Sequence, residues 1–303
     1  MRLDDERESD QVDDRRADGG GGGFGGLSGG GLGIGGVVLA LAASYFFGID
    51  PGTVLRIVQG GGGSIPQASA PAAPHPIPQG DAQAHFVAKV LASTEDVWAQ
   101  IFTEHGQTYR KPRLVLFSGQ TGTACGTGQQ AQGPFYCPGD ERVYIDLEFY
   151  RELQSRFHAP GEFAQAYVIA HEVGHHVQKL RGTSAKVEAA EHAAGSKAAA
   201  NGYSVKLELQ ADCYAGVWGH FADKNEHLIE PGEVEEALKA ASAIGDDTLQ
   251  KQARGYAVPD TFTHGTSAER VYWFRVGMDS GDPKQCNTFK GIDPAAGQDH
   301  ASP

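Results

Sequence analysis

Residues 168–177 read Val-Ile-Ala-His-Glu-Val-Gly-His-His-Val, and this stretch decides how the rest of the chain is interpreted. Its flanking positions are uncharged, as a buried helix requires. His171 and His175 are four positions apart, so a helix places both imidazoles on one face, where they can bind a single Zn²⁺. Glu172 lies one position further round, from which its carboxylate can take a proton from a metal-bound water. The pattern predicts a catalytic zinc site, and two histidines buried for structural reasons are the alternative.

Zinc that activates water needs three protein ligands and an open fourth position. The longer pattern His-Glu-x-x-His-x-x-Gly-x-x-His would supply the third ligand locally. This chain has Gln178 and Arg181 where that pattern requires Gly and His, so the sequence excludes the local arrangement.

The third ligand is better sought on a downstream helix of small and apolar residues. Glu208 and Asp212 are again i and i+4, and therefore share one helical face. We expect Glu208 to complete the zinc coordination and Asp212 to accept a hydrogen bond from a ligand histidine, His171. A solvated acidic face is one alternative. Two other histidines are rival third ligands: His192 and His220.

The chain has 303 residues and a formal net charge of −13. Nucleic-acid binding needs a dense cationic surface that releases phosphate counterions, and the sequence contains no basic stripe with interleaved aromatic residues. The composition therefore argues against a nucleic-acid partner.

Four cysteines are present, and none forms a Cys-x-x-Cys pair, so cysteine-ligated zinc is disfavoured. Cys125 and Cys137 enclose a short loop of Gly, Gln and Thr that has little else to order it. We expect a disulfide there and a second one between Cys213 and Cys286, although spacing alone does not fix the connectivity. Four unrelated buried thiols are the alternative.

The first 18 residues hold eight acidic and four basic residues, which predicts disorder. From Gly19 to Ile49 the chain has no charged residue, and the second half of this run is long and apolar enough to cross a bilayer. We expect a disordered cytoplasmic tail over residues 1–26 and one transmembrane helix over residues 27–49. A buried core helix and a cleaved signal peptide are the alternatives, and the long acidic lead-in disfavours the signal peptide.

Basic residues close to a membrane span determine its orientation. Four arginines precede the predicted span and Arg56 alone follows it closely, which places the amino terminus in the cytoplasm and the bulk of the chain in the periplasm or outside the cell. Disulfides are stable in such a compartment. Residues 50–80 are rich in Gly and then in Pro, which predicts a tether. The folded domain should occupy residues 81–303.

Within residues 81–303, strands are expected first and helices afterwards. Two short apolar runs, residues 114–117 and 143–147, are typical of strands. Amphipathic patterns predict helices at six positions: 83–104, 162–181, 184–199, 203–223, 232–243 and 267–278. This order favours an α+β domain dominated by helices, with a small sheet, after one transmembrane helix.

With these residues assembled, the chain resembles the neutral zinc metallopeptidase family of bacterial membrane proteins (the YpfJ-like family). The matching stretches are residues 111–117, 123–125, 133–137, 143–147, 163–178 and 210–216. The resemblance covers roughly residues 81–290 and implies a zinc peptidase with a single amino-terminal span. It implies no particular substrate.

The resemblance extends in outline to the wider Glu-zincin peptidases, which implies a zincin-like fold. In membrane-bound members of that group, a Thr-His-Pro segment leads into a helix that bears an Arg. Thr263-His264-Gly265 is similar, with Gly in place of Pro, and Arg270 follows on the predicted helix. His264 or Arg270 is therefore a candidate donor to the oxyanion of the reaction. A capped helix start with a surface histidine is the alternative.

These observations predict a membrane-anchored metallopeptidase that hydrolyses peptides or proteins with one Zn²⁺ on His171, His175 and Glu208. Glu172 would act as base and then as acid to the leaving amine. Residues 113–117 or 143–147 could form an edge strand that pairs with the substrate. The alternatives are a non-hydrolytic, zinc-stabilised adaptor at the membrane and a zinc amidase that acts on cell-wall peptides.

Overall fold

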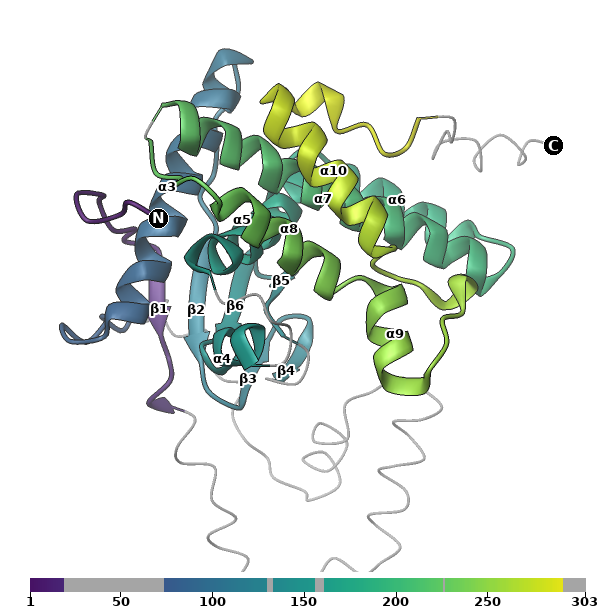
Figure 1. Ribbon diagram of the computed structural model, residues 1–303, viewed down its shortest axis with the longest axis horizontal. Helices are drawn as coiled ribbons and strands as arrows, with labels where there is room; N and C mark the ends of the chain where they lie inside the picture. Colours follow the sequence, from purple (N-terminus) through teal and green to yellow (C-terminus); the bar gives the residue numbers. More distant parts are fainter. Residues whose placement is uncertain (19–73, 130–132, 156–160, 226, 291–303) are drawn as a thin grey trace, which may run out of the picture. The chain divides into compact units, whose positions relative to one another are not determined.

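The computed structural model describes residues 1–18, 74–129, 133–155, 161–225 and 227–290. These residues all belong to one compact unit, formed by Met1–Gly19 together with Pro74–Pro303. Its elements are a small sheet, a two-stranded hairpin and a larger set of helices (Figure 1). The predicted α+β class with predominant helices is confirmed.

The main sheet has four strands in the order β1 (Val12–Asp14), β2 (Arg113–Phe117), β6 (Arg142–Asp146) and β5 (Phe135–Cys137). The β1–β2 and β2–β6 pairs are parallel, whereas β5 pairs antiparallel with β6. β2 is buried on both faces, which explains its uninterrupted apolar sequence Leu-Val-Leu-Phe. A separate hairpin is formed by β3 (Gln120–Thr123) and β4 (Gly126–Gln129).

The two predicted strands are confirmed to within one residue, but their predicted role as sheet edges is wrong. β2 lies between β1 and β6, and β6 lies between β2 and β5, so both edges of each strand are already paired. The edges of the sheet are instead β1 and β5, each a strand of three residues.

The helices are α3 (Ala82–Glu104), α4 (Glu148–Ser155), α5 (Glu162–Leu180), α6 (Thr183–Ala193), α7 (Lys197–Lys224), α8 (Glu233–Ala243), α9 (Asp246–Arg254) and α10 (Ser267–Ser280). α5 contacts α3 and the sheet on one side and α7 on the other, and α7 packs along α10 (Figure 1). Asp81 caps α3 by accepting the amide of Ala84, and Thr266 and Glu269 form a capping box at α10. The break between α6 and α7 lies earlier than predicted, because the Ser196 side chain caps α7.

Glycines allow α7 to approach both of its neighbours. A Cβ at Gly277 of α10 would collide with the carbonyl oxygen of Cys213, and one at Gly216 with that of Phe274. A Cβ at Gly174 would lie 3.0 Å from the carbonyl oxygen of Ala211, so α5 and α7 are also in close contact. This contact places the faces that carry the predicted zinc ligands opposite one another.

The first 18 residues are part of the folded unit, so the prediction that they form a disordered tail is wrong. β1 pairs with β2, with Val12 opposite Leu114, and the side chains of Leu3 and Val12 are buried in the main core. A strand of three residues that pairs with a segment about 100 positions away leaves no local hydrophobic pattern, which is why the sequence did not reveal it. The folded unit therefore includes residues 1–18 and resumes before the predicted start at residue 81.

Many charges of the same segment are bound within the unit. Arg7 forms ion pairs with Glu95 and Asp96 of α3, at 2.9 and 2.7 Å. Glu95 is fully buried, accepts a hydrogen bond from Ser9 and forms a further ion pair with Lys111. The polar composition that suggested disorder is thus explained by specific partners on α3.

The predicted span, residues 27–49, lies outside the described residues. No helix in the described part of the chain is long and apolar enough to cross a membrane. The predicted topology conflicts with the packing of β1, because a single crossing between residues 18 and 74 would put β1 and β2 on opposite sides of a bilayer, whereas they share one sheet. Residues 1–18 and 74–290 therefore lie in the same compartment.

Both predicted disulfides are confirmed. Cys125 is bonded to Cys137, which joins the β3–β4 hairpin to the edge strand β5. Cys213 of α7 is bonded to Cys286, which fixes the segment after α10 to the helix that carries Glu208 and Asp212.

Candidate metal centre

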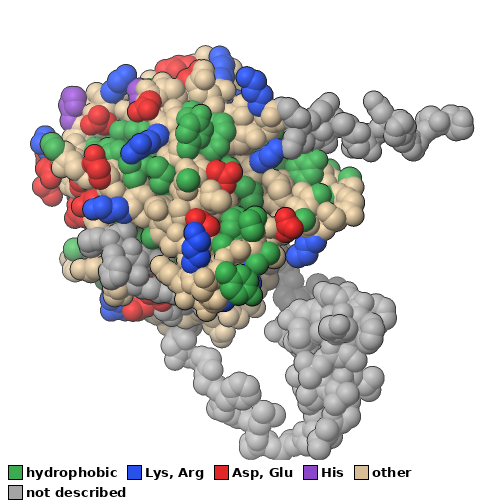
Figure 2. All heavy atoms as spheres, turned by 45° about the vertical axis from the view of Figure 1, so that its right-hand side comes forward, with side chains coloured by type: hydrophobic (Ala, Val, Ile, Leu, Met, Phe, Trp, Pro, Cys, Tyr) green, Lys and Arg blue, Asp and Glu red, His purple; other side chains and the backbone are tan. Residues whose placement is uncertain are grey.

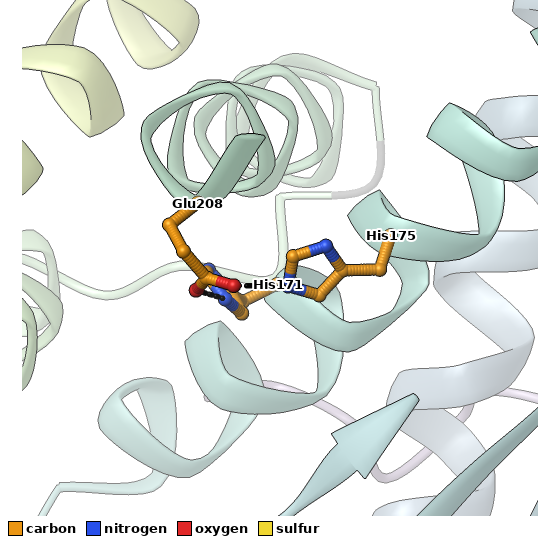
Figure 3. Close-up of side chains that lie close together, drawn as sticks. All are labelled: His171, His175 and Glu208. Carbon is orange, nitrogen blue, oxygen red and sulfur yellow. Dashed lines mark hydrogen bonds and ion pairs between the residues drawn. The ribbon is translucent and has the colours of Figure 1, made fainter. Parts of the chain in front are cut away.

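Two adjacent helices bring three possible metal ligands together (Figure 3). His171 and His175 lie one turn apart on α5, and Glu208 faces them from α7. The Nε2 atoms of His171 and His175 lie 3.2 and 3.4 Å from the two carboxylate oxygens of Glu208. Ligand atoms of the three residues all lie within 4.8 Å of one another. Two imidazoles and one carboxylate aimed at a common point are a suitable donor set for Zn²⁺.

The two neighbouring histidines keep the carboxyl group of Glu208 in its ionised form. Burial alone would raise the pKa of Glu208, but the adjacent His175 and His171 outweigh it and hold that pKa well below its usual range. Glu208 is therefore ionised, as a metal ligand must be.

Asp212 lies within hydrogen-bonding distance of His171, as predicted. Its Oδ1 atom is 2.8 Å from His171 Nδ1, which leaves His171 Nε2 free to face Glu208. Asp212 is fully buried. Burial would raise its pKa, but the charges of Arg270 and His171 dominate and lower the pKa to about 2.

Arg270 borders the cavity, but its guanidinium is bound to Asp212. Its Nε and Nη2 atoms donate to the two oxygens of Asp212 at 2.8 and 2.9 Å, and its side chain is 3% exposed. Nη2 also lies 3.2 Å from the hydroxyl of Tyr167, which itself donates to Asp212. Arg270 thus orients Asp212, and the alternative that it serves as an oxyanion donor is not favoured. Sequence reasoning missed Tyr167, although its position four residues before His171 placed it on the same helical face.

Gln178 is a second residue whose role was missed. Its Oε1 atom lies 2.9 Å from Nδ1 of His175, so each of the two histidines has its own partner at Nδ1. In the sequence, Gln178 served only to exclude the longer zinc-binding pattern. Its spacing of three residues from His175 on the same helix was the available signal.

A cavity of about 680 Å³ borders the metal group. Glu172 lines it, and burial raises the pKa of the Glu172 carboxyl above its usual value. The opposite wall includes Phe135 of the edge strand β5 and Phe149 of α4, and Leu249 of α9 also contributes. A basic carboxylate thus lies beside the ligand group and faces a space lined largely by apolar side chains.

His264 lines the same cavity, in a loop that Asp246 holds in place. Asp246 Oδ2 accepts the amides of Thr263, His264 and Gly265 at 2.7, 2.6 and 3.1 Å. The imidazole of His264 is 3.4 Å from Asp246 Oδ1, and this contact raises the His264 pKa. Gly265 has φ +89°, a conformation closed to proline, which accounts for Gly where the wider group has Pro.

The rival ligands lie elsewhere. The side chain of His192 is 82% exposed on α6, and His220 Nδ1 contacts the carbonyl of Met278. His176 is buried, with Nδ1 3.0 Å from the hydroxyl of Tyr136 and Nε2 2.6 Å from the carbonyl of Arg110. It therefore connects α5 to β5.

A mainly helical domain that brings a partly buried His-His-Glu group and the buried carboxylate of Glu172 together beside an open cavity has the architecture of a zinc-dependent hydrolase. The chain belongs to the family described as "Putative neutral zinc metallopeptidase", which matches residues 1–289. This confirms the family that the sequence motifs indicated, and it implies zinc as the cofactor. The match also includes the amino-terminal segment that forms β1.

Curated relatives agree with this assignment. The uncharacterized protein YpfJ of Escherichia coli (strain K12) is 49% identical over 293 residues, which cover 95% of this chain and 99% of the relative. The uncharacterized protein Rv2575 of Mycobacterium tuberculosis (strain ATCC 25618 / H37Rv) is 42% identical over 227 residues, or 70% of this chain and 74% of the relative. No solved structure matches the chain.

Proposed function

We propose that the protein hydrolyses peptide bonds as a zinc-dependent peptidase, with Glu172 as general base. The observation that carries this proposal is the number of ligands. The described residues provide a group of three, His171, His175 and Glu208, which leaves one position of a tetrahedral site open. A structural zinc site would be closed by a fourth protein ligand, so the open position disfavours a non-hydrolytic adaptor.

Zn²⁺ held by these residues would polarise the substrate carbonyl and make water acidic enough to be deprotonated near neutral pH. Glu172, whose pKa burial raises, accepts the proton from the attacking water. The water oxygen forms the new bond to the carbonyl carbon, and the C–N bond then breaks. Glu172 returns the proton to the leaving amine nitrogen, so the carboxylate is regenerated for the next cycle.

His264 is the proposed donor to the oxyanion formed on the substrate. It lines the cavity, and its contact with Asp246 raises its pKa, which favours the form with a proton on both ring nitrogens. Because Asp246 fixes three consecutive amides of this loop, the donor is held before substrate binds, as electrostatic stabilisation requires.

The edge strand β5 is the proposed docking site for an extended peptide. The two strands expected from the sequence for this role, residues 113–117 and 143–147, are both paired on their two edges within the sheet and have no free edge for a substrate. Among the described residues, β5 pairs with β6 alone, and its residues Phe135 and Tyr136 line the cavity. A substrate strand added there would run past the metal group with backbone hydrogen bonds to β5.

The proposed location of the domain is an oxidising compartment, and the two disulfides support this. Membrane attachment through residues 27–49 remains part of the proposal, with the amino-terminal segment and the zinc domain on the same side. Thiol labelling of the protein after denaturation in the presence of an alkylating reagent tests the compartment, because a domain from a reducing cytosol would yield four free thiols and an oxidised domain none.

The test of the activity compares the full chain with its Glu172→Gln variant. Zinc content is measured by elemental analysis and hydrolysis with a broad peptide library that includes cell-wall peptides. We expect both proteins to bind one zinc and only the first to cleave. Glu188→Gln, on the exposed face of α6, is the matched control and should cleave normally.

A zinc-loaded wild type that cleaves nothing, or a Glu172→Gln variant as active as wild type, would overturn the peptidase proposal. Cleavage restricted to cell-wall peptides would identify an amidase.

A further inference from the structure

The two ligand histidines are oriented by chemically different partners. His171 faces the carboxylate of Asp212, whereas His175 faces the neutral amide of Gln178, a side chain that is fully buried. A side-chain amide carries an oxygen, which accepts hydrogen bonds, and a nitrogen, which donates them. Only the oxygen can accept the Nδ1 proton of a histidine and so orient that histidine toward a metal. The question is what keeps the oxygen of Gln178 pointed at His175.

The nitrogen end of Gln178 answers that question. Its Nε2 donates to the carbonyl of Leu207 at 2.7 Å and lies 3.2 Å from Oε1 of Gln210. Both of these partners are acceptors, so a flipped amide would place oxygen against oxygen. The Gln178 oxygen is therefore held toward His175, whose Nδ1 must carry the proton, and His175 Nε2 keeps its lone pair for the metal.

Gln210 is fixed in the same way. Its Nε2 donates to the backbone carbonyl of Cys286 at 2.9 Å, which turns its oxygen toward Gln178. Gln210 is 7% exposed, so water does not compete freely for these bonds. The hydrogen bonds therefore run in one direction, from His175 to Gln178, from Gln178 to Gln210, and from Gln210 to the carbonyl of Cys286. Each of the two amides accepts on its oxygen and donates from its nitrogen.

The far end of the chain is covalently fixed. Cys286 lies after α10 and is bonded to Cys213, three residues beyond Gln210 on α7. The hydroxyl of Thr288 also donates to the carbonyl of Lys206, two residues before Glu208. The Cys286 carbonyl is thereby held against the helix that supplies the third ligand.

We propose that Gln178 and Gln210 are positioning residues for zinc, and that the Cys213–Cys286 disulfide determines zinc affinity through them. The proposal rests on the zinc site described above but not on peptide hydrolysis. Loss of a partner that orients a ligand histidine typically costs 10–100-fold in metal affinity. The disulfide would then serve the metal site as well as the stability of the fold.

The test measures zinc affinity of the full chain by competition with a chelator, and the visible absorption of the Co²⁺-substituted protein. Gln178→Met preserves the length of the side chain and removes its three hydrogen bonds, to His175, Leu207 and Gln210. We expect its zinc affinity to fall about 10–100-fold, with a changed Co²⁺ spectrum. Gln165→Met, at a partly exposed position of the same helix, is the matched control and should match wild type in both measurements.

A double-variant comparison distinguishes a chain from independent contacts. If Gln210 acts through Gln178, then Gln210→Met lowers affinity in the wild type and has no further effect in Gln178→Met. The pair Cys213→Ser and Cys286→Ser should show the same dependence on Gln178. Wild-type zinc affinity in Gln178→Met, or multiplicative losses in the double variant, would overturn the proposal. A wild type that binds no zinc would instead defeat the proposed function.

Discussion

The cavity has a helical wall, formed by residues of α5, α7 and α10, and a sheet wall, formed by residues of β5. The two walls are held by different kinds of interaction. On the helical side, Asp212, Arg270 and His171 make directional contacts between buried charged groups. On the sheet side, Phe135 stacks on Tyr144, and β5 is fixed by backbone pairing and a disulfide. Acidic, basic and apolar side chains are mixed over the face seen in Figure 2. The difference indicates that metal geometry depends on a few irreplaceable groups, whereas the substrate wall depends on covalent and backbone constraints.

Removal of residues 1–73 should have the largest effect, because it takes away a strand of the sheet. Burial of Leu3 and Val12 is lost, and Glu95 keeps only Lys111 as a charged partner. With roughly 1.5–3 kcal/mol for each apolar side chain and a further penalty for the buried carboxylate, we expect a loss of more than about 5 kcal/mol in the free energy of unfolding. Urea denaturation measures it.

A synthetic peptide of residues 1–18 should restore the stability of this truncated chain when added in trans. The same peptide with Arg7→Ala and Ser9→Ala should restore much less. A truncated chain as stable as the full one would show that β1 is not integral to the sheet.

Arg270→Met tests the helical side. The substitution leaves Asp212 buried without its cation, so we expect the free energy of unfolding to fall by about 3–5 kcal/mol. Chemical denaturation of the metal-free protein checks this, with Arg275→Met on the exposed face of α10 as control. A loss below about 1 kcal/mol would mean that Arg270 does not stabilise Asp212.

The two disulfides allow the walls to be compared directly. Replacement of Cys125 and Cys137 by Ser opens a loop with a sequence separation of 12, so a loss of about 3 kcal/mol is expected. Because this bridge fixes β5, KM for peptides should rise while zinc affinity stays unchanged. Replacement of Cys213 and Cys286 should instead lower zinc affinity. Equal changes in zinc affinity for both pairs would remove the distinction between the walls.

His176→Phe should give the smallest effect, about 1–2 kcal/mol, since it removes the hydrogen bonds that join α5 to β5. Burial lowers the His176 pKa from the usual 6.5, so protonation favours the unfolded state. The stability that neutral His176 contributes is present above about pH 6.5 and is lost as pH falls through the lower folded-state pKa.

Unfolding free energies of wild type and His176→Phe, measured from pH 8 to pH 5, should therefore converge toward acid. The exposed His192→Phe is the control and should follow wild type throughout. A constant difference between His176→Phe and wild type would contradict the assigned protonation state.

The helical wall was the more predictable from sequence, and the reason is periodicity. His171, His175, Glu208 and Asp212 follow the i, i+4 spacing, which a helix converts directly into proximity. The α5 and α7 faces could thus be matched from residue spacing alone. The role of Gln178 was not predicted, because an amide identifies its partner only when both of its ends are seen.

The sheet wall was less predictable, because its strands are short and their partners are distant. β5 has three residues and β1 has three, and β1 pairs with a strand about 100 positions along the chain. Neither shows the alternation that marks a longer strand. The charges around β1 suggested disorder, since their partners on α3 are invisible in one dimension. Because β1 was not recognised, residues 1–18 and the rest of the domain were predicted to lie on opposite sides of a membrane, which the pairing of β1 with β2 contradicts.

The start and the return of the segment 19–73 are joined at one point of the fold. Asp14 donates its amide to the carbonyl of His75, and the His75 amide donates to Asp13. These two hydrogen bonds hold residues 13–14 and residue 75 next to each other, so the distance between the two ends of segment 19–73 is fixed by the folded domain and not by the length of the segment. We therefore expect a change in the length of residues 19–73 to leave the pairing of β1 with β2 intact as long as these two hydrogen bonds are preserved.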